Sequence, residues 1–234
     1  KLNEILPGLF EKTEDYMELL LSISFSSSEG FLKQLINTIP EEDYENVEII
    51  GWLYQFYNSE RKDKVNNALK SKEDIPAATQ LFTPEWIVRY MVDNSLGRYW
   101  LERNPNSNLK DNLDYYFEEA PQIEEVSIIC KELRSNSIVP ENLKFFDPCM
   151  GSAHILVYAF DVYMEIYKEL GYSEREIPEL IIKNNLYGLD IDNRAYQLAY
   201  FTLLMKGRKF DRKLLNKNIS PNICAFKNSK ISEK

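Results

Sequence analysis

The feature that most constrains the fold is an alternation of short apolar runs with amphipathic stretches over about residues 143–225. The runs LKFFD, NLYGLDI and PNICAF are typical of buried strands, and the stretches between them have helical spacing. A strand, helix, strand, helix, strand order is the opening of a parallel α/β sheet with crossover connections. The sequence therefore predicts an α/β fold rather than a helical bundle in this part of the chain.

The two crossover helices have recognisable ends. The first is expected from about His154 to Leu170, because Gly171 follows it and helices often end at glycine. The second is expected to begin at a cap on Asp192 or Asn193 and to run through Met205, where Gly207 ends it. Each helix therefore follows the turn that comes after a predicted strand.

Residues 1–79 are predicted to form a helical N-terminal region, with no catalytic pattern and a packing or interaction role. Within EEDYENVEIIGWLYQFYNSERKDKV, apolar residues recur at steps of three and four, as on one face of an amphipathic helix. That face consists of Val47, Ile50, Leu53, Tyr54 and Tyr57.

A second unit is expected over residues 80–234, with a polar surface insertion at about 103–140 that holds a short helix near Ile123–Leu133. The unit begins with LFTPEWIVRYMVDNSL. There Thr83 is suited to cap a helix, and Pro84 to its first turn. The predicted apolar face of this helix is Val88, Met91, Val92, Ser95 and Tyr99.

Composition limits the classes of function. The net charge of −9 argues against a surface that grips nucleic acid everywhere, although Lys and Arg concentrate in residues 206–234, which could lie near nucleic acid or simply be solvated. Three scattered cysteines and a single histidine predict neither a disulfide framework nor a metal centre. No apolar run approaches the length of a membrane span, so we expect a cytoplasmic protein without a membrane partner.

Candidate binding residues lie where the first two strands end. Asp147 and Asp190 close these strands, and ligands of open parallel sheets bind beyond the carboxyl ends of the strands. Gly151, Ser152 and Ala153 form the first turn, where small side chains let backbone N–H groups approach a ligand. Both strand ends favour a cofactor containing adenosine, because an acid after the second strand can accept hydrogen bonds from ribose hydroxyls. A tight turn with capping aspartates remains the alternative.

The turn fits S-adenosylmethionine (SAM) better than NAD. A dinucleotide site favours G-x-G-x-x-G with an acid about 20 residues later, whereas this turn has only Gly151, and Asp190 lies 39 positions beyond it. SAM carries no phosphate, and its ammonium and sulfonium groups are cationic. A carboxylate at Asp147 therefore favours SAM.

Three motifs then resemble those of the N6-adenine DNA methyltransferases. DPCMGSAHIL resembles their motif I, NLYGLDIDNRAYQLA resembles motif II, and LFTPEWIVRYMV resembles the motif that precedes motif I in the gamma arrangement. All three occur in the family's order. The wider match over about residues 45–225 resembles the PglX-type methyltransferases of BREX phage-defence systems, and related restriction-modification methylases share parts of it.

The resemblance implies a role for each matched position. Thr83 and Pro84 would flank the methionine end of SAM. The loop beneath it would be formed by Asp147, Pro148, Gly151, Ser152 and Ala153. Asp190 would bind the ribose hydroxyls, and Ile191 would pack on the adenine. We expect Asp192 to cap the next helix, and His154 to belong to the pocket wall or the helix start.

Two departures from the family pattern stand out. Ala153 replaces the last glycine of the loop, so the loop must either keep a negative φ there or carry strain. The Asp/Asn-Pro-Pro-Tyr motif, which holds the extruded target base in this family, is absent, so no catalytic residue is assigned. We therefore expect an N-terminal fragment with the first half of a Rossmann-like SAM-dependent methyltransferase fold. It should not methylate DNA alone, because in the family that motif comes further along the chain, and most DNA-binding regions would lie outside the fragment too.

Two other functions stay open on the residues alone. The chain could be an assembly module whose helices dock other proteins of a defence system, without a cofactor of its own. A nicotinamide-dependent oxidoreductase is the third possibility, against which the single loop glycine counts.

Overall fold

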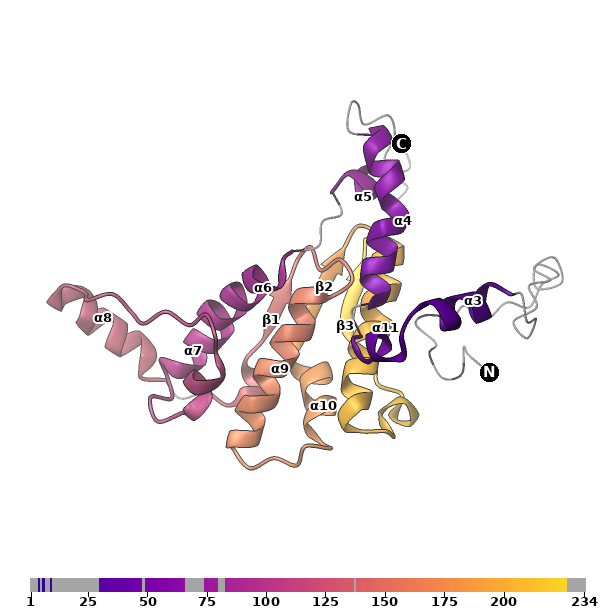
Figure 1. The fold of residues 1–234 in the computed structure, drawn as a ribbon. Coiled ribbons are helices and arrows are strands. Elements are labelled where there is room, and N and C mark those ends of the chain that lie inside the picture. Colours follow the sequence, from indigo (N-terminus) through magenta and orange to yellow (C-terminus); the bar gives the residue numbers. More distant parts are fainter. Residues whose placement is uncertain are drawn as a thin grey trace, which may run out of the picture.

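The computed structural model describes residues 30–47, 49–65, 74–79, 83–136 and 138–226, together with Glu4, Leu6 and Leu9. Its centre is a three-stranded parallel sheet in the order β1-β2-β3 (Figure 1). The strands are β1 (Phe145–Asp147), β2 (Leu186–Asp190) and β3 (Asn222–Ala225). These match the three predicted runs, so the α/β prediction is confirmed.

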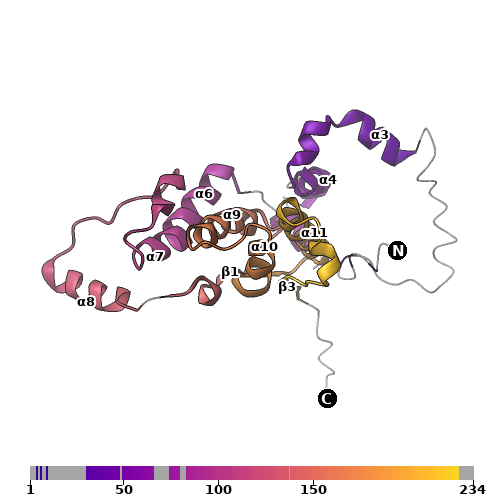
Figure 2. The ribbon, with the colours of Figure 1, turned by 90° about the horizontal axis from the view of Figure 1, so that it is seen from below.

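Among the described residues, helices cover one face of the sheet, and strand side chains on the other face are exposed. Helix α9 (His154–Glu169) packs against β1 and β2, and α11 (Asn193–Phe210) packs against β2 and β3. Figure 2 places both helices on the same side of the strands. On the opposite face, the Phe146 side chain is 59% exposed and Cys224 is also exposed. Parallel sheets usually have both faces covered, so the described residues contain one covering layer of this sheet.

A buried polar anchor fixes how β1 and β2 enter the sheet. Asn185 is fully buried just before β2, and its Nδ2 donates to the carbonyls of Pro140 (2.6 Å) and Leu143 (2.7 Å). From α9, the Tyr167 hydroxyl donates to Asn185 Oδ1 at 3.0 Å, and the Tyr163 hydroxyl donates to the Leu143 carbonyl at 2.8 Å. Because these groups are paired, their burial carries little penalty and sets the position of both strands.

The helix predicted after Thr83 forms, but its start and its buried face differ from the prediction. Thr83 does not cap it: α6 (Glu85–Val92) begins after Pro84 without a side-chain cap. A π-helical segment, Asp93–Gly97, then joins α6 to α7 (Arg98–Leu101). The wider π turn shifts the later residues around the axis. The buried face continues from Val88 and Val92 to Leu96 and Trp100, whereas Ser95 and Tyr99 are exposed. Met91, which precedes the π turn, is exposed as well.

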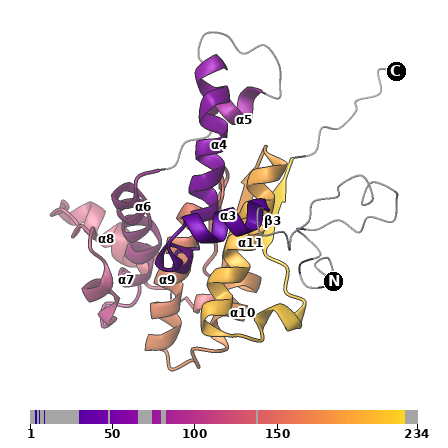
Figure 3. The same ribbon diagram turned by 45° about the vertical axis from the view of Figure 1, so that its right-hand side comes forward.

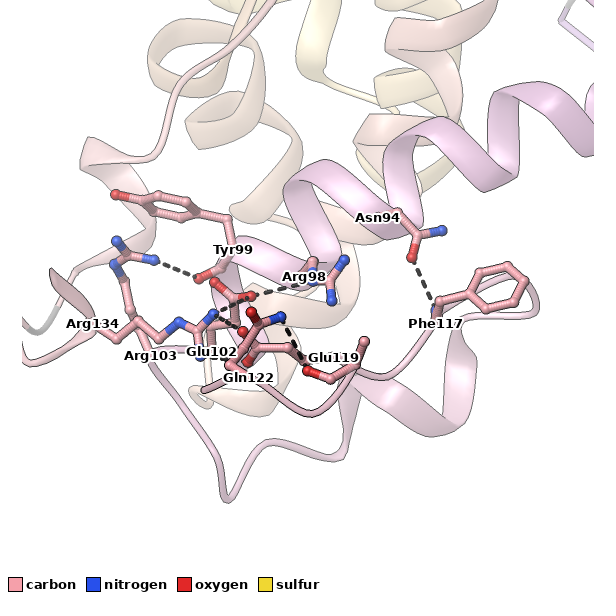
Figure 4. Close-up of polar contacts among 10 residues, drawn as sticks. Asn94, Arg98, Tyr99, Glu102, Arg103, Phe117, Glu119, Gln122 and Arg134 are labelled. Atoms are coloured by element: carbon pink, nitrogen blue, oxygen red, sulfur yellow. Dashed lines mark hydrogen bonds and ion pairs between the residues drawn. The ribbon is translucent and has the colours of Figure 1, made fainter. Parts of the chain in front are cut away.

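The polar insertion lies on the surface, and its predicted helix is α8 (Glu124–Arg134), which buries none of its residues. Figures 1 and 2 show α8 extending away from the body of the molecule. Arg134 attaches its end, pairing with Glu102 (3.0 Å) and Glu119 (2.7 Å), and Arg98 pairs with Glu102 as well (Figure 4). The two pairs of Arg134 thus hold the end of α8 to the end of α7 and to the loop before α8, and Arg98 keeps Glu102 in place.

The described part of the N-terminal region is helical. Its elements are α3 (Phe31–Thr38), a 3₁₀ turn at Glu41–Glu45, α4 (Ile49–Val65) and α5 (Asp74–Thr79). Figure 3 shows α4 extending beyond the sheet with α5 beside its far part. The predicted buried face of α4 is partly wrong, because Leu53 is 41% exposed and Tyr57 is 72% exposed. That face turns to solvent where the helix passes the body, whereas Tyr54 is partly buried.

Gly207 does not end α11, which continues to Phe210. A Cβ at Gly207 would lie 2.6 Å from Leu214 Cδ2, so the glycine serves close packing inside the helix rather than its end. Gly171 does end α9, with a positive φ of 85°. The remaining elements are α10 (Ile177–Leu180), a π turn at Ile181–Asn185, and 3₁₀ turns at Pro140–Asn142, Asn108–Asn112 and Leu214–Lys217. No helix in the described ranges has the length and apolar character that a bilayer crossing requires.

Candidate functional site

A cavity of about 350 Å³ opens beside the carboxyl ends of β1 and β2. This is the position at which open parallel sheets bind their ligands, and the volume falls in the range of small-molecule sites. Its walls come from the turn after β1, the turn after β2, the start of α9 and α11, and the segment before α6. The lining residues are Thr79, Thr83, Pro148, Cys149, Met150, Gly151, Ser152, His154, Ile155, Asp190, Ile191, Asp192 and Ala195.

The turn after β1 is held by backbone hydrogen bonds and by one buried side chain. The Cys149 N–H donates to Asp147 Oδ1 at 3.0 Å, and the Met150 N–H donates to the Leu189 carbonyl of β2 at 3.0 Å. The Met150 side chain is buried over Gly188, where a Cβ would lie 2.5 Å from its sulfur. Gly188 therefore makes room for the residue that anchors the turn.

Asp190 links the turns that follow β1 and β2. Its Oδ2 accepts the Gly151 N–H at 2.9 Å, and its Oδ1 accepts the Asp192 N–H at 2.8 Å. Each carboxylate oxygen has two lone-pair directions, so Asp190 keeps acceptor capacity toward the cavity. The residue thus shapes the pocket and remains able to bind a ligand hydroxyl.

Asp147 lies beneath the turn rather than in the cavity wall. It is 7% exposed, and its Oδ2 is buried without a hydrogen-bond partner among the described residues. Burial raises the pKa of this carboxyl, the Cys149 N–H lowers it in part, and the negative charge of Asp190 raises it further. An ionised Asp147 is consequently a poorly solvated negative charge directly behind the pocket.

Asp192 has two partners. Its Oδ1 accepts the Arg194 N–H at 2.9 Å and caps α11, which confirms the predicted capping role. Its Oδ2 accepts the hydroxyl of Tyr54 on α4 at 2.6 Å. Burial and, next, this hydrogen bond raise the pKa of Tyr54 to about 12, so the hydroxyl is a donor at neutral pH.

The structure brings most of the predicted site residues together. Six of them line the cavity: Thr83, Pro148, Gly151, Ser152, Asp190 and Ile191. Pro84 lines a neighbouring cavity instead, while Asp147 and Ala153 are buried beneath the turn. His154 lies at the start of α9 and in the pocket wall, as expected.

Ala153 adopts the strained alternative of the two that the sequence allowed. Its φ is +74°, in the left-handed region, and it sits just before α9. Gly151 has a φ of +54°, and nothing lies within 4 Å of where its Cβ would be. The turn thus uses two left-handed residues, of which only one is glycine.

Sequence reasoning did not assign Cys149, Met150, Ile155, Ala195 and Thr79 to the pocket. The first four follow from the turns and helix starts already identified, because neighbouring positions share the same wall. Tyr54 had no such indication, since it is 138 residues away from Asp192 in the sequence. Within the described ranges, no group of three or more His, Cys, Asp or Glu side chains could hold a metal ion.

Two curated proteins align with almost the whole chain. The adenine-specific methyltransferase BrxX of Escherichia coli O9:H4 (strain HS) is 50% identical over 230 residues, which is 98% of this chain and 19% of that protein. The adenine-specific methyltransferase PglX of Lacticaseibacillus casei (strain Zhang) is 47% identical over 240 residues, which is 95% of this chain and 19% of that protein. The chain is a homologue of adenine-specific methyltransferases. The resemblance to the PglX type is thereby confirmed.

A more distant relative is a putative type II restriction enzyme and methyltransferase of Methanocaldococcus jannaschii, 29% identical over 217 residues. That alignment covers 87% of this chain and 16% of the relative. No family model matches the chain. The chain thus spans about a fifth of the length of the BrxX and PglX proteins that it matches.

Proposed function

We propose that this chain binds SAM in the cavity at the ends of β1 and β2, as part of an adenine-specific DNA methyltransferase of a phage-defence or restriction-modification system. The observation that carries the proposal is the charge of the cavity. Asp190 and Asp192 line it, Asp147 lies behind it, and none of its lining residues in the described part of the chain is Lys or Arg. Such a wall suits a cationic adenosine ligand and opposes a pyrophosphate.

Two further observations fit the same ligand. The unpaired, buried Oδ2 of Asp147 would place a negative charge beneath the pocket when the carboxyl is ionised, in keeping with a ligand that carries positive charge. The open space at Gly151 lets a ligand approach the backbone of the turn, where a side chain would intrude. SAM, when bound, supplies a methyl group on a cationic sulfur.

The residues of the chain would bind and orient this ligand. Asp190 would accept hydrogen bonds from the ribose hydroxyls through the lone pairs that its two backbone donors leave available. Ile191, 53% exposed at the pocket, would pack against the adenine. Thr83, Pro84 and the turn from Pro148 to Ala153 would enclose the methionine end. In the whole enzyme, the methyl group would pass to the amino group of an adenine in DNA.

The test compares two glycines that both have a positive φ. Gly151 (φ +54°) and Gly171 (φ +85°) both have open space at the Cβ position, but Gly171 lies at the far end of α9. Replacing each with alanine should lower the free energy of unfolding by similar amounts, about 1 kcal/mol. In calorimetric titrations, SAM should bind the wild type and Gly171→Ala, whereas Gly151→Ala should bind much more weakly. Absence of saturable heat with the wild type, or preference for NAD over SAM, would contradict the proposal.

A second candidate is an assembly module, which the exposed apolar side chains of α4 and α8 favour. Phe56 and Tyr57 are 77% and 72% exposed, and Ile129 and Leu133 on α8 are 55% and 65% exposed. Exposed apolar surface of this kind marks interaction sites in soluble proteins. A module with assembly as its sole role would give no saturable heat with SAM, so the same calorimetry separates the two functions.

A further inference from the structure

A chain of hydrogen bonds connects the N-terminal helix α4 with both turns of the candidate pocket. The Tyr54 hydroxyl donates to Asp192 Oδ2 at 2.6 Å, and the Asp192 N–H donates to Asp190 Oδ1 at 2.8 Å. The other oxygen of Asp190 accepts the Gly151 N–H at 2.9 Å. Asn58, buried one turn further along α4, lowers the pKa of Tyr54 in part. The connection therefore reaches from α4 to the turn after β1 without a gap.

Helix α4 also borders the space next to the pocket. Trp52 and Phe56 line a second cavity of about 340 Å³, together with Thr83 and His154, which line the candidate pocket too. Tyr54 lies between these two aromatic residues in the sequence and reaches Asp192. The first half of α4 thus contacts the turn after β2 through Tyr54 and lines the neighbouring cavity through Trp52 and Phe56.

We propose that Tyr54 is a positioning residue for the cofactor site: by holding Asp192, it fixes the turn between Asp190 and α11, so that docking of α4 raises cofactor affinity. The inference rests on the proposed function, because it assumes that the pocket binds SAM. It adds a role for the N-terminal region, to which the sequence assigned no part in the pocket.

The geometry explains how one hydroxyl can act at a distance. Each oxygen of Asp192 accepts one hydrogen bond, one from the Arg194 N–H and the other from Tyr54, and the two contacts together restrict the orientation of its side chain. Its own N–H fixes Asp190, whose second oxygen fixes Gly151. Without Tyr54, Asp192 Oδ2 would be solvated and the turn would sample other conformations. A ligand that binds one of several conformations loses affinity in proportion to the population of that one.

The primary test replaces Tyr54 with phenylalanine in the whole 234-residue chain, with Tyr57→Phe as the matched control. Tyr57→Phe likewise removes a tyrosine hydroxyl from α4, but Tyr57 is 72% exposed. By isothermal titration calorimetry with SAM, Y54F should bind at least about fivefold more weakly, the lower end of typical coupling between sites, and Y57F should bind like the wild type. Asp192→Asn should weaken binding more than Y54F does, because it changes the same contact and also removes a negative charge from the wall of the pocket.

A second readout separates positioning from a general loss of stability. Coupling is reciprocal, so SAM should slow hydrogen exchange of the α4 amides in the wild type and in Y57F, but not in Y54F. Equal SAM affinity of Y54F and the wild type, or α4 exchange that SAM leaves unchanged, would overturn the role of Tyr54 while the SAM site stands. No SAM binding by the wild type would overturn the proposed function, and the positioning role with it.

Discussion

The buried carboxylate of Asp147 leads to a prediction in which stability and ligand binding change in opposite directions. Asp147 is 7% exposed, its Oδ1 accepts the Cys149 N–H at 3.0 Å, and its Oδ2 has no partner among the described residues. Asp147→Asn keeps the acceptor for Cys149 and the shape of the side chain, and it removes the charge. The variant therefore isolates the effect of a buried negative charge beneath the pocket.

The free protein should become more stable. A buried polar group without a partner costs about 1–3 kcal/mol and a charged one more, and asparagine still leaves one amide group unpaired. The variant therefore avoids only the extra cost of burying a charge instead of a neutral group. This difference should raise the free energy of unfolding by about 1 kcal/mol at pH 7.

The pH dependence has a definite sign. Burial raises the pKa of Asp147 in the folded protein above its unfolded value. The stability that protonation of Asp147 contributes is therefore fully present below the unfolded pKa of about 3.9 and is lost as pH rises through the folded pKa. Asparagine does not titrate. The advantage of the variant should accordingly shrink as pH falls and disappear below about pH 4.

Ligand binding should respond in the opposite direction. Loss of the negative charge behind the pocket should weaken SAM binding by about tenfold, the effect of a nearby opposite charge. The neutral analogue 5′-methylthioadenosine, which carries neither the ammonium nor the sulfonium, should bind the variant and the wild type equally.

The assays are urea denaturation at a series of pH values and calorimetry with the two ligands. A less stable variant at pH 7 would refute the reasoning about the buried charge. An equal loss of affinity for SAM and for the neutral analogue would show that the substitution disturbs the turn itself, and the electrostatic role would be wrong.

Three further changes test the surrounding structure. Gly188→Ala should lower the free energy of unfolding by about 1–3 kcal/mol, as overpacking does, because the new Cβ would lie 2.5 Å from the Met150 sulfur; a neutral result in urea denaturation would contradict this packing. Ala153→Gly should change it by less than about 1 kcal/mol, because relief of the left-handed φ is opposed by a more flexible unfolded chain and a lost buried methyl; a loss above about 2 kcal/mol would show that the alanine is unstrained. The stability that Tyr54 contributes should be complete below its unfolded pKa of about 10 and be lost as pH rises through about 12. Alkaline denaturation of the wild type and of Y54F, compared side by side, measures this contribution.

Much of the pocket could be predicted because its parts are local in sequence. Strand residues, turn residues and helix caps are specified by neighbours, so Asp147 and Asp190 fall at the ends of β1 and β2 as expected. Parallel strands place their carboxyl ends at one edge, and this property alone brings Gly151 and Asp190 within hydrogen-bond distance.

The failures involve partners that are distant in sequence. Gly207 has the sequence pattern of a helix end, but the space it leaves is filled by Leu214, and the helix continues. A π turn at Asp93–Gly97 rotated the buried face of the helix after Thr83 in a way that a 3.6-residue period does not anticipate. In both cases packing outweighs the local pattern.

The sequence by itself determined the three strands, the turns that follow two of them and the acids that close them, because these depend on residue types within a few positions of one another. Only the tertiary structure decided that Asp147 lies beneath the pocket instead of in its wall, and that α4 reaches the turn after β2. Burial and contacts across 138 residues depend on how the elements pack, and packing is a property of the folded chain rather than of any short stretch of it.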